Sequence, residues 1–268
     1  MPHVVSGGEQ LSEQPISETH DIDGRAIHLR PLHPELQLTY IHNILSPEEL
    51  ERLVQLATER DGWARSPLKS QGSGARLSKD ERRNSSSCPL LWPIVYADKR
   101  EVLEARSPAL LEELQLVERL TARVASLFTA TGMELTANYI EPLQLVRYKA
   151  SEHFGPHHDY HELNSQGQLG SSVQGEQRAF TVLIFGTTLP PGAGGETHFC
   201  ELDVAVSPTL GDAVVWANVG PDGEPDPRSL HQGRPPKDGH EKVAINVWIS
   251  DQEFNPAAGA MEGAVRSG

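Results

Sequence analysis

The stretch SEHFGPHHDYHE, residues 151–162, holds four histidines and an aspartate that could bind a metal ion. They are His153, His157, His158, His161 and Asp159. A helical conformation is disfavoured, because Gly155 and Pro156 interrupt the segment. In an extended conformation alternate side chains share a face, so His157 and Asp159 point to one side while His158 points away.

One histidine and one carboxylate two residues apart supply two ligands of a facial triad. This arrangement of two histidines and one carboxylate binds Fe(II) in non-haem oxygenases and leaves coordination positions open. The H-E-x-x-H pattern of zinc helices is absent, since Leu163, Asn164 and Ser165 follow Glu162. The third ligand must come from another part of the chain. His231 is the favoured candidate, because it precedes a Gly/Pro loop that leads into a predicted strand.

That predicted strand, KVAINVWIS, carries a lysine whose position needs an explanation. Strand alternation places Lys242, Ala244, Asn246 and Trp248 on one face of the strand. A lysine on the inward face of a barrel is costly unless it has an anionic partner. A bound dicarboxylate would supply that partner.

The composition narrows the classes of protein to which the chain can belong. With 23 basic and 37 acidic residues, the net charge of -14 disfavours nucleic-acid and anionic-membrane partners. The N-terminus has neither the basic region nor the apolar core of a signal peptide, and no apolar run approaches a transmembrane span. Two cysteines are too few for a disulfide framework. We therefore expect a cytoplasmic or nuclear protein. The sequence does not distinguish a monomer from an oligomer.

Two helices and a series of strands are expected to position the candidate residues. Ser46, Pro47 and Glu49 form the cap, first-turn and capping-box positions of a helix. Apolar residues at helical spacing predict a second helix over residues 108–129. From residue 139 onward, short apolar segments separated by Gly, Pro and Asp predict an antiparallel barrel or jelly roll. These strand segments are LQLVRYKA, AFTVLIFG, GDAVVWAN and KVAINVWIS.

We expect one folded domain over residues 25–254, with its catalytic core at about 139–251. The polar residues 1–24 predict a mobile N-terminal tail, and the small-residue-rich residues 255–268 a flexible C-terminal tail. Residues 65–87 contain six basic residues, two acidic ones and almost no apolar ones, which predicts an exposed loop. One hypothesis is that this basic loop closes over a substrate.

Taken in order, seven motifs resemble the prolyl 4-hydroxylase-like branch of the Fe(II)/2-oxoglutarate-dependent dioxygenases. The resemblance extends over roughly residues 38–251. The matching segments are LQLVRY, HHD, RAFTVLIFG, GGET, SPTLGDAVVWAN, DPRSLHQGRPP and GHEKVAINVW. The resemblance implies a mainly β (α+β) fold, a double-stranded β-helix (jelly roll, cupin-like) with N-terminal supporting helices.

The resemblance also implies roles for particular residues in metal and co-substrate binding. His157, Asp159 and His231 correspond to the catalytic iron ligands of the family. Lys242 corresponds to the basic residue that binds the distal carboxylate of 2-oxoglutarate. Its alternative is a lysine whose head group reaches water.

Five further residues are expected to line the same pocket. By resemblance, Tyr148 and Thr197 assist 2-oxoglutarate binding and Trp248 forms a wall of the co-substrate pocket. Arg178 and Trp216 are candidates for substrate contact. A structural salt bridge is the alternative for Arg178, and core packing is the alternative for both tryptophans.

The sequence departs from the family pattern at two points. Ser151 stands where the family often has glycine, and the stretch from His231 to Lys242 is one residue longer than the commonest spacing. We expect the additional residue in a turn at residues 238–240, because the spacing from Lys242 to Trp248 is retained.

The activity implied by the resemblance is hydroxylation of an unactivated C–H bond, with release of succinate and CO2. The expected cofactor is Fe(II), the co-substrates are 2-oxoglutarate and O2, and L-ascorbate is expected to support turnover. The favoured substrate is a prolyl residue in a peptide or protein. The alternatives are a hydroxylase of free amino acids or other small molecules, a non-catalytic metal-binding barrel, and a zinc hydrolase, which would leave Lys242 unexplained.

Overall fold

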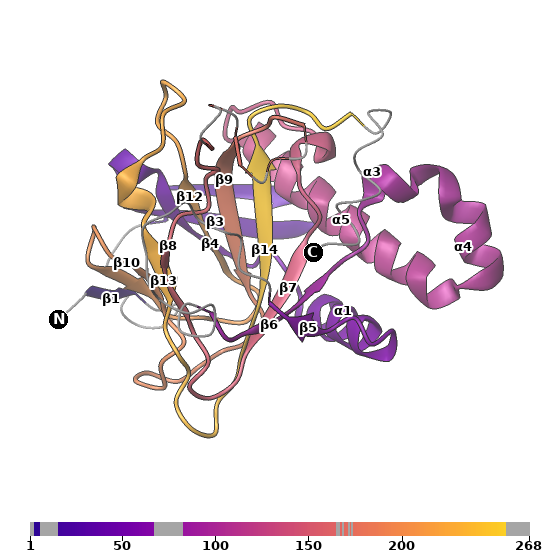
Figure 1. Cartoon of the computed structure of the whole chain (residues 1–268), viewed down its shortest axis with the longest axis horizontal. Helices are drawn as coiled ribbons and strands as arrows, with labels where there is room; N and C mark the ends of the chain where they lie inside the picture. The colour runs from indigo at the N-terminus through magenta and orange to yellow at the C-terminus, as the bar shows by residue number, and fades with distance from the viewer. Residues whose placement is uncertain are drawn as a thin grey trace.

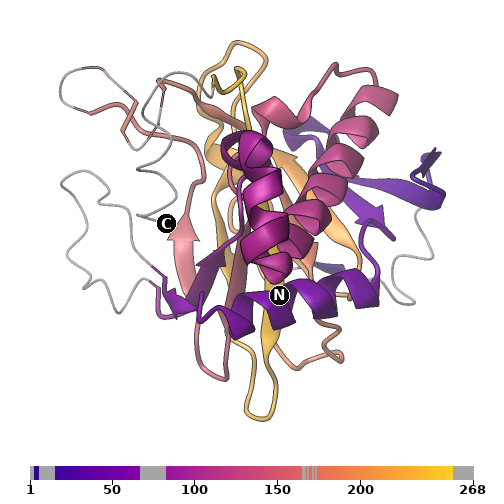
Figure 2. The ribbon, with the colours of Figure 1, turned by 90° about the vertical axis from the view of Figure 1, so that its right-hand side faces the viewer.

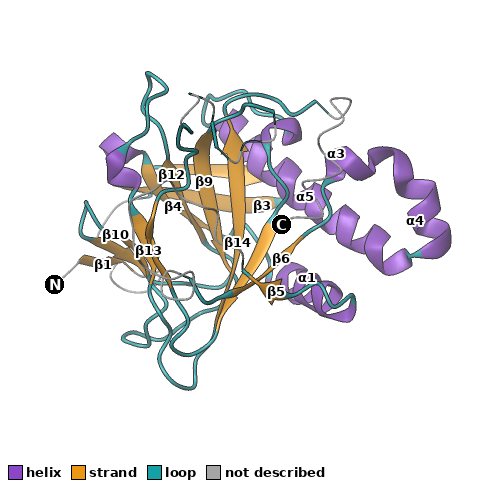
Figure 3. Cartoon of the chain, in the orientation of Figure 1, coloured by secondary structure: helices purple, strands orange, loops and turns teal. Residues whose placement is uncertain are grey.

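Two β-sheets and a layer of helices make up the part of the chain that the computed structural model describes (Figures 1 and 3). The described residues are 3–5, 16–66, 83–164, 167, 169–170, 172 and 174–255. The larger sheet has nine strands in the order β2-β3-β4-β12-β9-β14-β7-β6-β5, and the smaller has five in the order β1-β11-β10-β13-β8. The expected jelly roll with supporting helices is confirmed.

The larger sheet is antiparallel throughout and contains all four strands that the sequence predicted. Its strands are β2 (Glu18–Ile22), β3 (Arg25–His33), β4 (Leu38–His42), β5 (Ala64–Arg65), β6 (Ser86–Pro89), β7 (Gln144–Tyr148), β9 (Arg178–Phe185), β12 (Ala213–Ala217) and β14 (Lys242–Ser250). The predicted four are β7, β9, β12 and β14. Strand β14 lies between β7 and β9, which places Lys242 opposite Tyr148 and Trp248 opposite Thr181.

The smaller sheet packs against the inner face of the larger one. Its strands are β1 (His3–Val5), β8 (Phe154–His157), β10 (Thr197–Phe199), β11 (Val204–Val206) and β13 (His231–Gly233). All pairs are antiparallel except β1 with β11. An apolar core fills the space between the sheets and includes Tyr148, Leu183, Phe185, Phe199 and Trp216.

The helices lie together against the outer face of the larger sheet (Figure 2). They are α1 (Pro47–Glu59), α3 (Pro93–Tyr96), α4 (Arg100–Arg106) and α5 (Pro108–Ala130). The 3-10 turns of the described residues are η2 (Pro34–Leu36), η3 (Ala97–Lys99), η4 (Ala137–Tyr139) and η5 (Pro227–Ser229), of which η2 and η5 lie away from this helical layer (Figure 3). The predicted capping box is present, since Ser46 and Glu49 exchange side-chain and backbone hydrogen bonds. No helix within the described residues is long and apolar enough to cross a membrane.

Two sequence predictions need correction. The expected tail of residues 1–24 is wrong for Glu18–Ile22, which form β2 by pairing with β3, and for the short strand β1. The polar side chains of β2 gave no strand pattern in the sequence. An edge strand forms through backbone hydrogen bonds with its neighbour and does not need an alternating apolar pattern. The expected exposed loop is wrong at its ends, where Arg65 lies in β5 and Arg83 is buried. The substrate-lid hypothesis concerns mainly residues 67–82, which lie outside the described residues, as do residues 256–268 of the expected C-terminal tail.

A buried ion pair ties the helical layer to the sheet. Glu113 on α5 is 0% exposed and accepts hydrogen bonds from the Arg60 guanidinium and from the backbone N–H of Leu91. Arg60 also donates to the carbonyl of Pro89 at the end of β6. Removing one partner of such a buried pair leaves the other charge uncompensated.

The Glu113→Ala substitution should therefore lower the free energy of unfolding by about 3–5 kcal/mol, as measured by denaturant unfolding. The matched control is Glu112→Ala, which removes the neighbouring, half-exposed partner of Arg52 and should cost less than about 1 kcal/mol. Equal effects of the two substitutions would contradict this account of the helix–sheet contact.

Candidate active site

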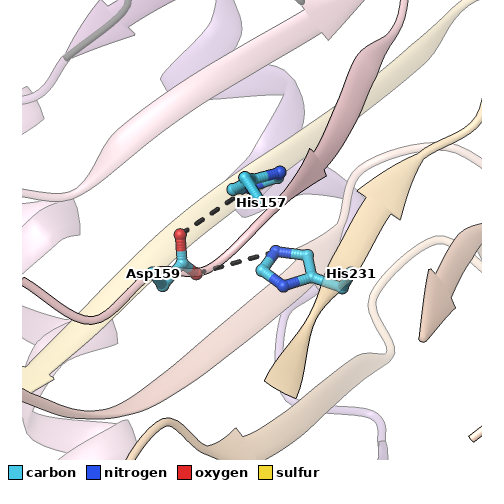
Figure 4. A group of neighbouring side chains, drawn as sticks. All are labelled: His157, Asp159 and His231. Atoms are coloured by element: carbon cyan, nitrogen blue, oxygen red, sulfur yellow. Dashed lines mark ion pairs between the residues drawn. The ribbon is translucent and has the colours of Figure 1, made fainter. Parts of the chain in front are cut away.

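The structure brings His157, Asp159 and His231 together from two strands and a loop (Figure 4). His157 ends β8, Asp159 lies in the loop that follows, and His231 begins β13. The Nε2 atoms of His157 and His231 each lie 3.8 Å from a different oxygen of Asp159. The three ligand atoms lie within 4.8 Å of one another and could hold one metal ion between them.

Backbone carbonyls fix the orientation of both imidazoles. Nδ1 of His157 donates to the carbonyl of Gly155 at 2.8 Å, and Nδ1 of His231 donates to that of Ser229 at 2.9 Å. With the proton on Nδ1, Nε2 carries the lone pair that a metal ion requires. Both rings therefore present their metal-binding nitrogens to Asp159.

A chain of hydrogen bonds supports the carboxylate of Asp159. Thr181 Oγ1 donates to Asp159 Oδ2 at 2.8 Å, and Asn218 Nδ2 donates to Thr181 Oγ1 at 2.8 Å. The indole N–H of Trp216 completes the chain by donating to Asn218 Oδ1 at 3.0 Å. Side chains that hydrogen-bond to a metal ligand in this way fix its orientation and so contribute to metal affinity. Neither Thr181 nor Asn218 was among the residues predicted from the sequence, although alternation along β9 places Thr181 on the inward face.

The protonation states of His157 and Asp159 suit a metal site. Burial, reinforced by the neighbouring His231, lowers the pKa of His157 to about 3. Burial alone would raise the pKa of Asp159, but the facing imidazoles of His231 and His157 outweigh it and hold that pKa below its ordinary value. At neutral pH His157 is therefore neutral and Asp159 ionised, which are the forms that bind metal ions.

Deeper between the sheets, Lys242 carries a buried positive charge. Its side chain is 2% exposed, and Nζ donates to Thr197 Oγ1 at 3.2 Å but forms no ion pair with a described residue. Burial lowers the pKa of Lys242 to about 8, against a smaller opposing effect of Glu196. A buried lysine with only a hydroxyl partner matches the expected pocket for a carboxylate ligand.

Aromatic side chains surround the Lys242 ammonium. The rings of Tyr148 and Phe185 have their centroids 5.8 and 5.9 Å from Nζ. Burial raises the pKa of Tyr148, so its phenol is protonated at neutral pH. The structure thus brings the predicted residues Tyr148 and Thr197 next to Lys242. Between His231 and Lys242 lies a turn in which Gly239 has a φ of 83°, and the placement of the additional residue in this turn stays a prediction.

Arg178, a candidate for substrate contact, is buried and paired with a carboxylate. Its guanidinium forms two 2.6 Å hydrogen bonds with the carboxylate of Glu141 and lies 3.7 Å from the ring centroid of Trp248. A buried guanidinium held by two carboxylate oxygens has a structural role, the alternative that the sequence left open. The sequence gave no local signal for Glu141 as its partner.

Trp216 and Trp248 lie on opposite sides of this region. Trp216 is 1% exposed and packs with its ring centroid 4.8 Å from that of His231. This packing is the core role that the sequence left open for Trp216, and its contact with a substrate stays a prediction. Trp248 lies on the inward face of β14, where its indole N–H is buried without a hydrogen-bond partner.

A second group of potential metal ligands lies nearby. Glu141, His161 and Glu176 have ligand atoms within 4.8 Å of one another. Both oxygens of Glu141, however, accept hydrogen bonds from Arg178, whose positive charge opposes cation binding there. The triad of His157, Asp159 and His231 is therefore the stronger candidate metal centre.

Comparisons with known proteins agree with this site. The model of the 2OG-Fe(II) oxygenase superfamily matches residues 143–250, which include the triad and Lys242. The chain is 30% identical over 230 residues to prolyl 4-hydroxylase subunit alpha-3 of Rattus norvegicus, covering 85% of this chain and 36% of that protein. It is 28% identical over 253 residues to prolyl 4-hydroxylase 1 of Arabidopsis thaliana, covering 86% and 76%. The chain thus spans little more than a third of the alpha-3 subunit.

Solved structures show the same fold. A viral collagen prolyl hydroxylase from Paramecium Bursaria Chlorella virus-1, solved as a 2OG complex, matches with a TM-score of 0.56 and 20% identity, covering 80% of this chain and 95% of that one. A prolyl hydroxylase from Trichoplax adhaerens, in complex with a peptide fragment of hypoxia inducible factor, matches with a TM-score of 0.52 and 15% identity, covering 80% and 83%.

Substitution of Lys242 tests whether its buried charge is uncompensated in the ligand-free protein. Lys242→Met should raise the free energy of unfolding at pH 7 by about 1–3 kcal/mol, measured by denaturant unfolding. Between pH 8 and 10.5 the folded wild type binds fewer protons than its unfolded chain, because the pKa of Lys242 is lowered from 10.5 to about 8. The free energy of unfolding of the wild type should therefore increase with pH across this window. The variant should not show this increase.

The matched control is Lys237→Met, which removes an exposed lysine and should leave the stability and its pH dependence almost unchanged. A Lys242→Met variant that is less stable than the wild type at pH 7 would contradict the proposed electrostatic cost.

Proposed function

Since this chain belongs to the 2OG-Fe(II) oxygenase superfamily, we propose that it hydroxylates a prolyl residue of a peptide or protein, with Fe(II) held by His157, Asp159 and His231. The observation that carries this proposal is the joint presence of a facial triad and a buried, unpaired lysine between the same two sheets. A metal site alone would leave Lys242 unexplained.

The chain is an oxidoreductase that uses Fe(II), 2-oxoglutarate and O2. When bound, these supply the oxidising chemistry: O2 is reduced, 2-oxoglutarate loses CO2 to become succinate, and one oxygen atom enters a substrate C–H bond. The donor set fits Fe(II), because two imidazole nitrogens and one carboxylate bind one face of the ion and leave coordination positions open. The support of turnover by L-ascorbate stays a prediction.

The protein's own side chains bind the co-substrate, orient the metal ligands and exclude water from the buried ammonium. In this proposal the Lys242 ammonium pairs with the distal carboxylate of 2-oxoglutarate, and the Thr197 hydroxyl beside it orients the ammonium. The Thr181 hydroxyl holds one oxygen of Asp159 and so fixes the direction in which the other points. Tyr148 and Phe185 keep water from the buried ammonium, where charge pairing is strong because the surroundings are apolar.

The proposal of a peptidyl substrate rests on the relatives. The curated relatives named above are prolyl 4-hydroxylases, and one structural neighbour contains a bound peptide fragment. Arg178 does not contribute to this proposal, because Glu141 already accepts its hydrogen bonds. A small-molecule substrate is the alternative that the following experiment separates.

The test is succinate release by the purified protein with Fe(II), 2-oxoglutarate and ascorbate, in the presence of proline-containing peptides. Each peptide is compared with the same sequence carrying alanine in place of proline. We expect proline peptides to raise succinate release at least about tenfold and the product peptide to gain one oxygen atom. His231→Ala should abolish this turnover, because it removes a metal ligand.

His240→Ala is the matched control, since it removes a histidine from the turn before β14 and should retain turnover. Succinate release that depends on His231 but ignores every peptide would direct the substrate search to small molecules. Absence of succinate in all conditions, with iron bound, would contradict the proposed activity and favour a non-catalytic barrel.

A further inference from the structure

Arg30 on β3 is a buried cation outside the candidate active site. Its side chain is 8% exposed, and its Nε and Nη1 atoms are buried without a hydrogen-bond partner. It also forms no ion pair with a described residue. An arginine buried in this way is costly unless an anion compensates it. Two other buried arginines, Arg123 and Arg178, each have carboxylate partners.

Two histidines share the sheet face of Arg30. In the register of β3 with β4, His28 pairs with His42 and Arg30 pairs with Tyr40. Directly opposite side chains have Cβ atoms about 5 Å apart and diagonal ones about 7–8 Å, so the Arg30 guanidinium can reach the space beside His42. Nε2 of His42 is also buried without a hydrogen-bond partner. Nδ1 of His28 is hydrogen-bonded to Thr19, which leaves its Nε2 for another partner.

The carboxylate of Asp212 contacts His42, but other groups also occupy it. Its Oδ2 accepts a hydrogen bond from the Tyr40 hydroxyl, and its Oδ1 accepts one from the backbone N–H of Asn43. Nδ1 of His42 lies 3.3 Å from Oδ2. Asp212 therefore orients His42 and Tyr40, while the Arg30 guanidinium remains without a carboxylate.

The Arg30 cluster is separate from the pocket at Lys242. Tyr40 is fully buried and lies between them, with its ring centroid 6.4 Å from that of Phe185. The ring centroid of Phe185 in turn lies 5.9 Å from Nζ of Lys242. An anion at Arg30 would therefore not occupy the position proposed for 2-oxoglutarate.

We propose that Arg30, with His42 and His28, forms a binding site for a small oxyanion, a phosphate or a carboxylate. The planar guanidinium can donate two parallel hydrogen bonds to two oxygens of such a group. His42, held by Asp212 through Nδ1, would line the site from the neighbouring strand. His28, with Nδ1 accepting from the Thr19 hydroxyl, would add a third donor through Nε2. His28 and His42 are only partly buried, so the site is open to ligand from solvent on their side.

The test measures the thermal unfolding of the full chain with inorganic phosphate, with succinate or with sodium chloride at equal ionic strength. The variants are Arg30→Met, which keeps the apolar stem, and Arg30→Lys, which keeps the charge but not the two-pronged donor. The succinate series is done in the Lys242→Met background, so that binding in the active site does not contribute. Arg52→Met, which removes an arginine already paired with Glu112, is the matched control.

We expect phosphate or succinate, but not chloride, to raise the unfolding temperature of the Arg30-containing protein. Whichever anion acts at the lower concentration identifies the ligand class. Arg30→Met should bind that anion at least about tenfold more weakly and unfold at a higher temperature without it, because it lacks the buried charge. Arg30→Lys should lie between the two, and the control should behave as the wild type. The site would be refuted by absence of any anion effect, or by an equal effect on Arg30→Met.

Discussion

Two imidazoles and one carboxylate must meet within 4.8 Å, although His231 lies on another strand, far along the chain from His157 and Asp159. The smaller sheet meets this requirement by pairing β13 directly with β8, so that His231 lies opposite His157. The larger sheet orients the carboxylate, because Thr181 on β9 donates a hydrogen bond to Asp159. Asn218 in turn donates to Thr181, and Trp216 donates to Asn218. The helices on the outer face contribute by fixing the larger sheet.

The same architecture places an electrostatic cost at the site. Lys242 is buried opposite Tyr148 with a hydroxyl as its hydrogen-bond partner, and burial lowers its pKa to about 8. A more stable protein would have an apolar residue there. In the proposed function a bound dicarboxylate offsets the cost of burying the Lys242 charge. The ligand-free protein is therefore less stable than it would be with an apolar residue there, and the co-substrate binds more tightly.

The sequence predicted those features that depend on local patterns. Alternation placed His157 with Asp159 and Lys242 on an inward face, and the residues around Ser46 predicted the start of α1. Departures from the family pattern were also informative: Ser151, where glycine is common, has a φ of 69°, a conformation that glycine adopts at lower cost. The sequence could not predict the partner of Arg178 or the chain from Asp159 to Trp216, because these contacts join side chains from different strands. It also missed β2, whose edge position does not require apolar residues.

The most direct test of the central claim is an anaerobic titration of Fe(II) into the metal-free protein in the presence of 2-oxoglutarate. The measurement follows the visible absorption band that forms when 2-oxoglutarate chelates ferrous iron. The account predicts a saturable band in the wild type, its loss in His231→Ala, and at least a tenfold higher half-saturating concentration of 2-oxoglutarate, about 1.4 kcal/mol or more, in Lys242→Met. An unchanged band in both variants would show that iron and 2-oxoglutarate bind elsewhere and would contradict the assignment of this site.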